Sequence, residues 1–379
     1  YSEDCVMTRA REFADLAGSA DAGGITGKNL IGNGAMQVAQ RGTSFSDTGS
    51  ASEGFFTLDR YHFQKSGLDE MRFTASQDSE VPSGQGFANS LKVAVTTAET
   101  ELGANEYFRF RTRVEAQDLQ HLAYNTSSAK PLTLSCWVRS SLTGKYSVLF
   151  FKADDGSPYR SNTTSFTISS ANTWEKKTMT IAGDTGGVID DDNGYGLSIN
   201  FQLGAGTSYS GTPHTEWGVY SVTDDWSHSD SVNFIGQTGT FYITGIQLEV
   251  GDKATPFEHR SFADELARCQ RYYYRKNADS AYSMLGSGMN ATTSSSRIHI
   301  DFPVEMRTAP SLGQSANSTW AVYSGTQSPA FSSDATINNA STHSSAITTT
   351  TSASLTVGQG ALLMANNDAS AYLEFDAEF

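Results

Sequence analysis

Cysteine is scarce in this chain, and its scarcity limits how the fold can be stabilised. Three cysteines, Cys5, Cys136 and Cys269, stand far apart among 379 residues. Because their number is odd and they are widely separated, we expect no disulfide scaffold. Cys136 lies within an apolar run that predicts a strand, so we expect it to be a small core residue rather than a reactive thiol.

Long apolar runs are also missing. No stretch approaches the roughly 18 consecutive apolar residues of a membrane span, and no signal-peptide pattern is present. We therefore expect neither membrane insertion nor export through a secretion route. The sequence begins at Tyr1 rather than at an initiator Met, so we expect an upstream portion, one that could hold an attachment domain.

Positive charge is in short supply. The chain has 26 Lys and Arg against 41 Asp and Glu, a formal net charge of −15. Nonspecific nucleic-acid binding depends on Lys and Arg displacing counterions, so we do not expect a nucleic-acid partner. An acidic surface suits a protein that stays soluble outside a cell.

Recognisable catalytic motifs are absent as well. Seven histidines are scattered without an HxH, an HExxH or a Cys/His cluster, so zinc catalysis has no support. No GxSxG elbow, Walker loop or dinucleotide fingerprint appears, and the Gly-rich pieces lie where turns between strands need them. The sequence predicts a protein that is not an enzyme and needs no cofactor.

Short strand-like runs separated by turns dominate what is there. Hydrophobic content is 38% and Gly is abundant, which favours short strands over long helices. We predict an all-β fold, a jelly-roll-like β-sandwich followed by a short helix and a smaller C-terminal β-domain. The sandwich strands are expected at Met36–Gln40, Tyr61–Lys65, Arg72–Ser76, Ser90–Thr96, Tyr107–Val114, Leu132–Ser140, Tyr146–Lys152, Thr164–Ile168, Glu175–Ile181, Leu197–Leu203 and Thr240–Val250.

The stretch after the last of these strands predicts a domain boundary near residue 257. Gly251 and Asp252 form a turn, Pro256 forces an extended exit, and Ser261 begins a helix to about Cys269. The predicted organisation is an N-terminal helix and linker at 1–28, the sandwich at 29–256, the connecting helix at 257–271 and the C-terminal β-domain at 272–379.

The C-terminal region mixes strands with long Ser, Thr, Asn and Ala tracts, which rarely form a large monomeric core. Further strands are expected at 271–274, 297–302, 320–323, 346–357 and 372–379. We expect this region to be an oligomerisation or tip domain that packs against copies of itself in a homotrimer. Aromatic residues are enriched in interfaces, so Tyr272, Tyr273 and Tyr274 are the predicted subunit contacts.

Arginines alternate along the predicted strand Tyr107–Val114. Arg109, Arg111 and Arg113 share one face because side chains alternate with a period of two. Three unpaired buried guanidiniums would be very costly, so we expect this face to be solvated or paired with acids on a neighbouring strand.

Aromatic residues in the polar stretch 204–239 give a functional hint. Tyr209, Trp217 and Trp226 stand there among Gly, Ser, Thr and Asp, and rings beside polar groups match the two kinds of surface on a sugar. We predict glycan binding by these three residues. The alternative is that they serve packing or subunit contact, with Trp217 closing one end of the sandwich.

Clustered aspartates admit three interpretations. Asp154/Asp155, Asp190–Asp192 and Asp224/Asp225 could supply the carboxylate pair of a glycoside hydrolase, yet each also stands in a turn where Asp satisfies backbone donors. Asp190 and Asp192, with Glu249, could instead hold a structural calcium.

Several segments together resemble a family. These are the segment Asn29–Gly42, Tyr61, the segment Asp184–Gly187 followed by Asp192-Asn193-Gly194, and the segment Gly239–Arg271. They resemble structural fibre and appendage proteins of tailed bacteriophages, whose block from Asn29 to Gly251 is similar to carbohydrate-binding modules. The resemblance implies a noncatalytic virion protein, such as a tail fibre, that attaches to a host-surface glycan and to other virion proteins. The alternatives are a purely structural capsid decoration or fibre shaft, and a polysaccharide-depolymerising tailspike.

Overall fold

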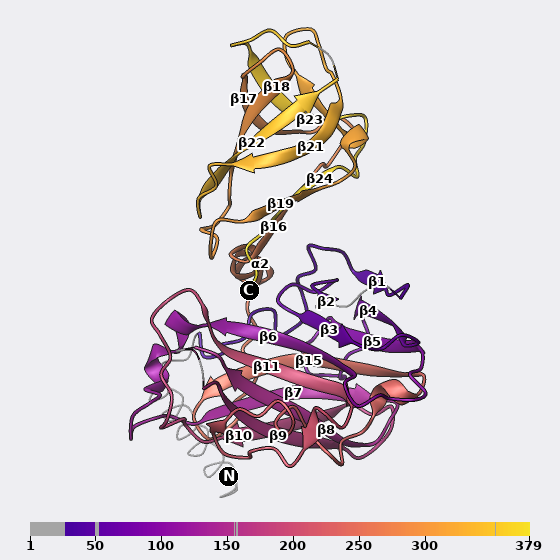
Figure 1. Cartoon of the computed structure of the whole chain (residues 1–379), viewed down its shortest axis with the longest axis vertical. Coiled ribbons are helices and arrows are strands. Elements are labelled where there is room, and N and C mark those ends of the chain that lie inside the picture. The colour runs from indigo at the N-terminus through magenta and orange to yellow at the C-terminus, as the bar shows by residue number, and fades with distance from the viewer. Residues whose placement is uncertain (1–26, 50–52, 155, 157, 353) are drawn as a thin grey trace, which may run out of the picture. The chain divides into compact units, whose positions relative to one another are not determined.

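The computed structural model describes residues 27–49, 53–154, 156, 158–352 and 354–379 (Figure 1). The helix expected within residues 1–28 and Cys5 lie outside the described residues. The chain divides into two compact units, one extending to Phe262 and including Phe379, the other spanning Ala263 to Glu378. Among the described residues, no helix is both long and apolar enough to cross a membrane.

The first unit is a sandwich of two antiparallel sheets. The six-stranded sheet has the order β1-β4-β5-β15-β7-β10 and the seven-stranded sheet the order β13-β9-β8-β11-β6-β3-β2. Their bounds are β1 Ser44–Ser46, β2 Glu53–Gly54, β3 His62–Ser66, β4 Arg72–Asp78, β5 Ser90–Thr97, β6 Tyr107–Glu115, β7 Leu132–Ser140, β8 Gly144–Lys152, β9 Arg160–Ile168, β10 Glu175–Ile181, β11 Tyr195–Ala205, β13 Gly218–Val219 and β15 Gly239–Val250.

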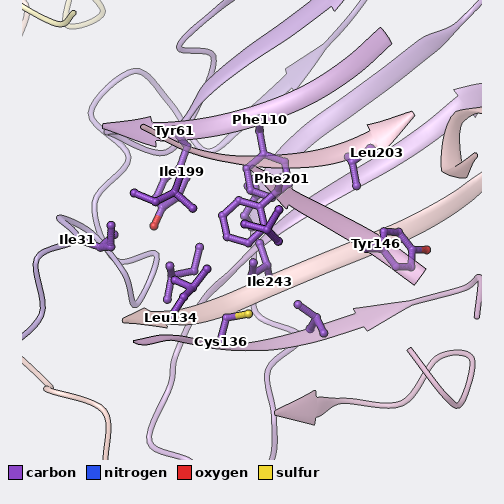
Figure 2. Close-up of a cluster of buried hydrophobic side chains, with 14 of the residues drawn as sticks. Ile31, Tyr61, Phe110, Leu134, Cys136, Tyr146, Ile199, Phe201, Leu203 and Ile243 are labelled. Atoms are coloured by element: carbon purple, nitrogen blue, oxygen red, sulfur yellow. The ribbon is translucent and has the colours of Figure 1, made fainter. Parts of the chain in front are cut away.

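Alternating side chains form the core between these sheets (Figure 2). Phe110 of β6 stacks on Phe201 of β11 with ring centroids 4.9 Å apart, and it faces Phe241 of the opposite sheet at 6.2 Å. Cys136 is fully buried and free, which confirms the core role predicted for it. Burial raises the pKa of its thiol to about 12, so it is unreactive at neutral pH.

The closing strand β15 contains a bulge that depends on a glycine. Its register with β7 shifts between Thr244 and Gln247, and Gly245 has a φ of +61°. A Cβ on Gly245 would lie 2.5 Å from the Phe87 ring. Only glycine combines this left-handed conformation with so close a contact.

The strand predicted at Met36–Gln40 is wrong, because this segment follows a turn at residues 32–35 and forms no strand. Asn33 and Met36 both have a φ of +57°. The Asn33 amide donates to the carbonyls of Val38 at 2.8 Å and Asp59 at 3.0 Å, while the Met36 side chain is fully buried. The segment Asn33–Met36 is therefore packed into the protein interior and stabilises the fold.

The second unit begins within helix α2, Phe262–Gln270, which confirms the predicted helix. It contains a three-stranded sheet, β16-β24-β19, and a six-stranded sheet, β20-β23-β17-β18-β22-β21. The bounds are β16 Tyr273–Asn277, β17 Met284–Asn290, β18 Ser295–Asp301, β19 Ser311–Gln314, β20 Trp320–Tyr323, β21 Phe331–Asn338, β22 Ser344–Thr351, β23 Gly360–Ala365 and β24 Tyr372–Asp376. The all-β prediction is confirmed in both units.

This unit has its own core, despite its polar composition. Trp320, Leu363 and Phe375 are fully buried within it. The tyrosines predicted as subunit contacts make their contacts within the second unit. Tyr273 is 2% exposed and its hydroxyl donates 2.5 Å to Glu374, and the Tyr274 ring stacks on Phe375. Tyr272 is also buried. The rings of Tyr272 and Tyr273 are therefore not exposed for contact with another subunit.

Candidate functional site

Strands β3, β6 and β11 run side by side in the seven-stranded sheet (Figure 1). Polar side chains occupy the face of these strands that points away from the core. Alternation along each strand sends Phe63, Phe110 and Phe201 into the core and the intervening residues outward. We call this surface the polar face; it carries His62, Gln64, Arg109, Arg111, Arg113, Ser198, Asn200 and Gln202.

Strand register arranges the polar face in rows. Arg111 stands between His62 on β3 and Asn200 on β11. Arg109 stands between Gln64 and Gln202 in the same way. Directly opposite side chains in antiparallel strands lie about 5 Å apart, so the members of each row are neighbours.

Arg109 is the buried member of the arginine strand. It is 7% exposed, and its Nε and Nη2 atoms donate to Gln64 Oε1 at 2.9 and 2.6 Å. Its guanidinium carbon lies 3.8 Å from the centre of the Trp226 ring. Burial lowers the pKa of Arg109 to about 10, which still leaves it charged at neutral pH.

Of the two alternatives expected for these arginines, a solvated face or acids on a neighbouring strand, the second is not found, because their cross-strand partners are neutral. The residues opposite Arg109 and Arg111 are glutamines, an asparagine and a histidine. Arg111 forms no hydrogen bond or ion pair with any residue that the structure describes, and its Nε atom is buried without a partner. Burial lowers its pKa to about 10, and the charge of Glu53 acts in the opposite direction.

Orphaned polar atoms surround Arg111. Gln202 is 4% exposed, and neither its Nε2 nor its Oε1 has a hydrogen-bond partner. The Nδ1 atom of His62 is also buried and unpaired. Buried polar groups in native proteins are nearly always satisfied, so this concentration of unpaired atoms on one face points to a ligand or solvent contact.

The field of the arginines also acts on His62. Its pKa is lowered to about 3, first by burial and then by the charges of Arg111, Arg113, Arg109 and Arg41. His62 is therefore neutral at physiological pH, and the polar face carries its positive charge on the arginines.

Aromatic rings border the polar face on the β8 side. The rings of Tyr107, Tyr209 and Trp226 pack together at centroid distances of 4.6 to 4.9 Å. Phe151 of β8 contacts Tyr220 at 4.8 Å, and it stands opposite Ser198 of the polar face. We call Phe151, Tyr159 and Tyr220 the aromatic border; all three are at least partly exposed.

The three residues predicted to bind glycan are only partly brought together. Tyr209 and Trp226 are neighbours, with ring centroids 4.6 Å apart. Trp226 is 8% exposed, because Arg109 and Tyr209 pack against it and its indole donates to the Tyr220 hydroxyl. Its role is to fix the loop over the sheet rather than to present an open ring.

Trp217 lies elsewhere, at an end of the sandwich. Its indole Nε1 donates 2.8 Å to the Ala182 carbonyl, and its ring packs edge-on against Tyr124 at 5.8 Å. This position matches the alternative in which Trp217 closes the sandwich.

The carboxylates of Asp154, Asp192 and Asp225 are engaged in local structure. Asp225 accepts hydrogen bonds from Ser161 Oγ at 2.9 Å and from the amides of His214 and Ser221. Asp192 accepts from the Gly194 amide, and Asp154 accepts from the Asp190 amide. Asp155 lies outside the described residues.

The predicted calcium ligands are not gathered. Glu249 accepts hydrogen bonds from the backbone and hydroxyl of Thr255. Among the residues that the structure describes, no group of three or more His, Cys, Asp or Glu side chains has the arrangement of a metal site.

A buried ion cluster accounts for the Asp184-Thr185-Gly186-Gly187 motif. Asp184 accepts two hydrogen bonds of 2.7 Å from Arg160 and lies 3.0 Å from Lys152 Nζ. A Cβ on Gly187 would lie 2.5 Å from both Arg160 and Lys152. A cavity of about 100 Å³ lies beside this cluster. Since Asp184 is satisfied by these partners, the cluster stabilises the fold.

Sequence reasoning found the arginines but missed their neutral neighbours. Asn200 and Gln202 alternate with Ile199, Phe201 and Leu203 along the sequence. That alternation was available as a signal for an outward polar face. The pairing with β3 and β6 was not, because register joins residues far apart in sequence.

No protein-family model matches this chain, and no curated protein sequence matches it. Among solved structures, similarity extends to the enzymatically active domain of tailspike protein 4 of bacteriophage CBA120, at 12% identity and a TM-score of 0.31, covering 59% of this chain and 21% of that chain. A family 4 carbohydrate-binding module is similar at 12% identity and a TM-score of 0.30, covering 58% of this chain and 99% of the module.

A family 11 carbohydrate-binding module from Clostridium thermocellum, in complex with a β-1,3-1,4-mixed-linked tetrasaccharide, is similar at 12% identity and a TM-score of 0.28, covering 56% of this chain and 98% of the module. The chain spans about a fifth of the tailspike chain. At these identities and scores, function has to be argued from the chain's own residues.

Proposed function

We propose that this chain is a noncatalytic adhesion protein that binds glycan on the polar face. The observation that carries the proposal is the concentration of unpaired polar atoms of Arg111, Gln202 and His62 on one sheet surface. Glycan hydroxyls both donate and accept hydrogen bonds, so they suit a surface that presents guanidinium, amide and imidazole groups together.

The aromatic border supplies the second half of a sugar site. Tyr159 is 42% exposed, and Phe151 and Tyr220 are partly exposed beside the polar row of Ser198. Aromatic rings pack against the apolar face of a sugar while neighbouring polar groups fix its orientation. This arrangement supports binding along the sheet surface rather than in a deep cavity.

The carboxylates support a noncatalytic role. Glycoside hydrolysis needs an acid and a second carboxylate about 5 to 10 Å apart across the bond that is cleaved. Asp192 and Asp225 are instead committed to backbone and hydroxyl donors. Incubating the protein with host polysaccharide and finding new reducing ends would refute this part of the proposal and favour a depolymerase.

The wider role that we propose is host attachment from a virion appendage, such as a tail fibre, with the chain assembled as a homotrimer and joined to other virion proteins. The resemblance of the Asn29–Gly42 and Gly239–Arg271 segments to phage appendage proteins supports this assignment. Exposed Met284, Met289 and Tyr323 in the second unit support self-association. Linked copies multiply weak binding without new contacts.

A glycan array probed with the intact protein, followed by titration of the best ligand, tests the binding function. The informative variant is Gln202→Leu, which removes both unpaired amide atoms at nearly constant volume. We expect its affinity to fall about 2- to 10-fold, the value of one or two hydrogen bonds. Its stability should be unchanged or higher, because an unsatisfied buried polar group is lost.

The matched control is Gln237→Leu, the same change at an exposed residue of the same unit. It should bind as the parent does. No binding of any glycan by the intact protein would overturn the proposal and favour a purely structural decoration or shaft.

A further inference from the structure

We infer that the glycan bound by the polar face is acidic, and that Arg111 contacts its carboxylate or sulfate group directly. This inference rests on the proposed function, since it names the class of ligand for the same site. It is carried by Arg111, whose guanidinium has no described partner although its Nε atom is buried.

A guanidinium that is partly buried and unpaired is costly, and an anionic ligand group removes that cost. The planar fork of Arg matches the two oxygens of a carboxylate or sulfate, and such paired bonds are about twice as strong as neutral ones. A neutral sugar offers only hydroxyl and ring oxygens, which satisfy the donors of Arg111 but leave its charge uncompensated.

The surroundings of Arg111 favour an anion over a cation or a neutral group. Its cross-strand neighbours, His62 and Asn200, carry no negative charge, and Arg109 lies on the same strand face. The charge of Arg109 adds to the effect of burial in lowering the pKa of Arg111, while Tyr195, Glu53 and Tyr107 act in the opposite direction. The charges of Arg111, Arg113 and Arg109 also lower the pKa of His62, after the larger effect of its burial.

Neighbouring groups have the chemistry to bind the rest of an acidic sugar. Gln202 is diagonal to Arg111 across the β6–β11 pair, at roughly 7 to 8 Å between Cα atoms for such positions. Its unpaired amide donates through Nε2 and accepts through Oε1. A carboxylate on Arg111 therefore places the ring hydroxyls within reach of Gln202 and His62.

Net charge distinguishes this site from a nucleic-acid site. The chain carries a net charge of −15, and polynucleotide binding requires many phosphate contacts along a basic surface. A small group of arginines within an acidic protein selects instead for single anionic substituents spaced along an otherwise polar chain.

The test is isothermal titration of the full chain with four probes: an oligogalacturonate, a sulfated oligosaccharide, a neutral oligogalactan and a single-stranded oligonucleotide. We expect binding of one or both acidic glycans, at least 10-fold weaker binding of the neutral one and no binding of the oligonucleotide. Comparison of the first two probes identifies the carboxylate or the sulfate as the recognised group.

Variants locate the contact. Arg111→Gln should weaken binding of the acidic glycan at least 10-fold, and Arg111→Lys should restore only part of it, because Lys keeps the charge but lacks the fork. Arg297→Ala is the charge-matched control, at an exposed position of the second unit, and should leave affinity unchanged. Circular dichroism of each variant separates a binding defect from a folding defect.

The outcomes distinguish a failure of the acidic-glycan inference from a failure of glycan binding itself. Equal binding of neutral and acidic glycans, unaffected by Arg111→Gln, would overturn the inference and leave glycan binding intact. Binding of no glycan at all would remove the proposed function as well. Oligonucleotide binding as strong as that of the acidic glycans would replace a glycan site with a general polyanion site.

Discussion

The guanidinium carbon of Arg109 lies 3.8 Å from the centre of the Trp226 ring. This contact joins the polar face of β6 to a loop more than a hundred residues later in the chain. Tyr107 and Tyr209 complete the packing around Trp226. A desolvated cation–π contact of this kind is worth up to about 2 kcal/mol. It places the loop that carries Tyr220 at the edge of the polar face.

Replacing Trp226 should therefore affect stability first. We expect Trp226→Ala to lower the free energy of unfolding by about 3 kcal/mol, the lower part of the range for a buried Trp, measured by urea denaturation. Trp226→Phe should recover much of this loss, since it keeps a ring over Arg109. If Trp226→Ala abolished glycan binding with no loss of stability, Trp226 would be a direct sugar contact instead.

The buried cluster around Asp184 predicts a second large effect. Burial alone would raise the pKa of Asp184, but hydrogen bonds from Arg160, the Gly186 amide and Lys152 outweigh it and hold the pKa below its ordinary value. Asp184→Asn leaves Lys152 buried without its anion, so we expect a loss of about 3 to 5 kcal/mol.

The control for Asp184 is Asp230→Asn. Asp230 also pairs with a lysine, Lys145, but this pair is exposed, so we expect no measurable change in unfolding free energy. Equal midpoints for the two variants in urea denaturation would contradict a stabilising role for the buried cluster.

His62 predicts a dependence of stability on pH. Its folded pKa of about 3 lies below the ordinary value of 6.5. Between these values the unfolded chain binds a proton that the folded chain does not, so the free energy of unfolding should fall as pH is lowered from about 6.5. One proton contributes at most about 1.4 kcal/mol per pH unit.

The variant His62→Gln should remove this contribution while keeping a polar side chain beside Arg111. Thermal or urea unfolding of both proteins from pH 7.5 to pH 4 isolates the effect of His62 from that of other groups. Parallel stability curves for the two proteins would show that the pKa of His62 is the same in the folded and unfolded chain, and would contradict this prediction.

Gly245 predicts a steric effect that can be separated from backbone strain. Gly245→Ala adds a Cβ within 2.5 Å of Phe87 at a φ of +61°. Gly84→Ala has a φ of +73° but meets no atom within 4 Å. We expect about 1 kcal/mol of destabilisation for Gly84→Ala from the left-handed conformation, and a further 1 to 3 kcal/mol, roughly, for Gly245→Ala from overpacking.

Met289 tests self-association. It is 52% exposed on β17, and a charge there would be costly in a subunit interface. We expect Met289→Glu to lower the mass measured by light scattering from that of a trimer, while Val219→Glu, at an exposed residue of the first unit, leaves it unchanged. A parent protein that is a folded monomer at low concentration would remove the trimer proposal.

Strong local patterns predicted much of the fold. The strands expected at Leu132–Ser140 and Glu175–Ile181 are β7 and β10, with the predicted bounds. Strands with weak patterns were missed, including β17, with its glycines, and β21, whose outward residues are small and polar. Met36–Gln40 was predicted as a strand, but the Asn33 side chain hydrogen-bonds to the backbone of Val38 and holds this segment in an irregular conformation after a turn.

The sequence by itself determined that the chain is built of strands, that Cys136 is buried and that three arginines share one face of β6, because alternation of apolar and polar side chains is a local property. Tertiary structure alone decided what faces those arginines. His62 and Gln202 reach Arg111 through strand pairing between segments far apart in the chain. A shift of one residue in that register would turn the same side chains to the opposite face of the sheet.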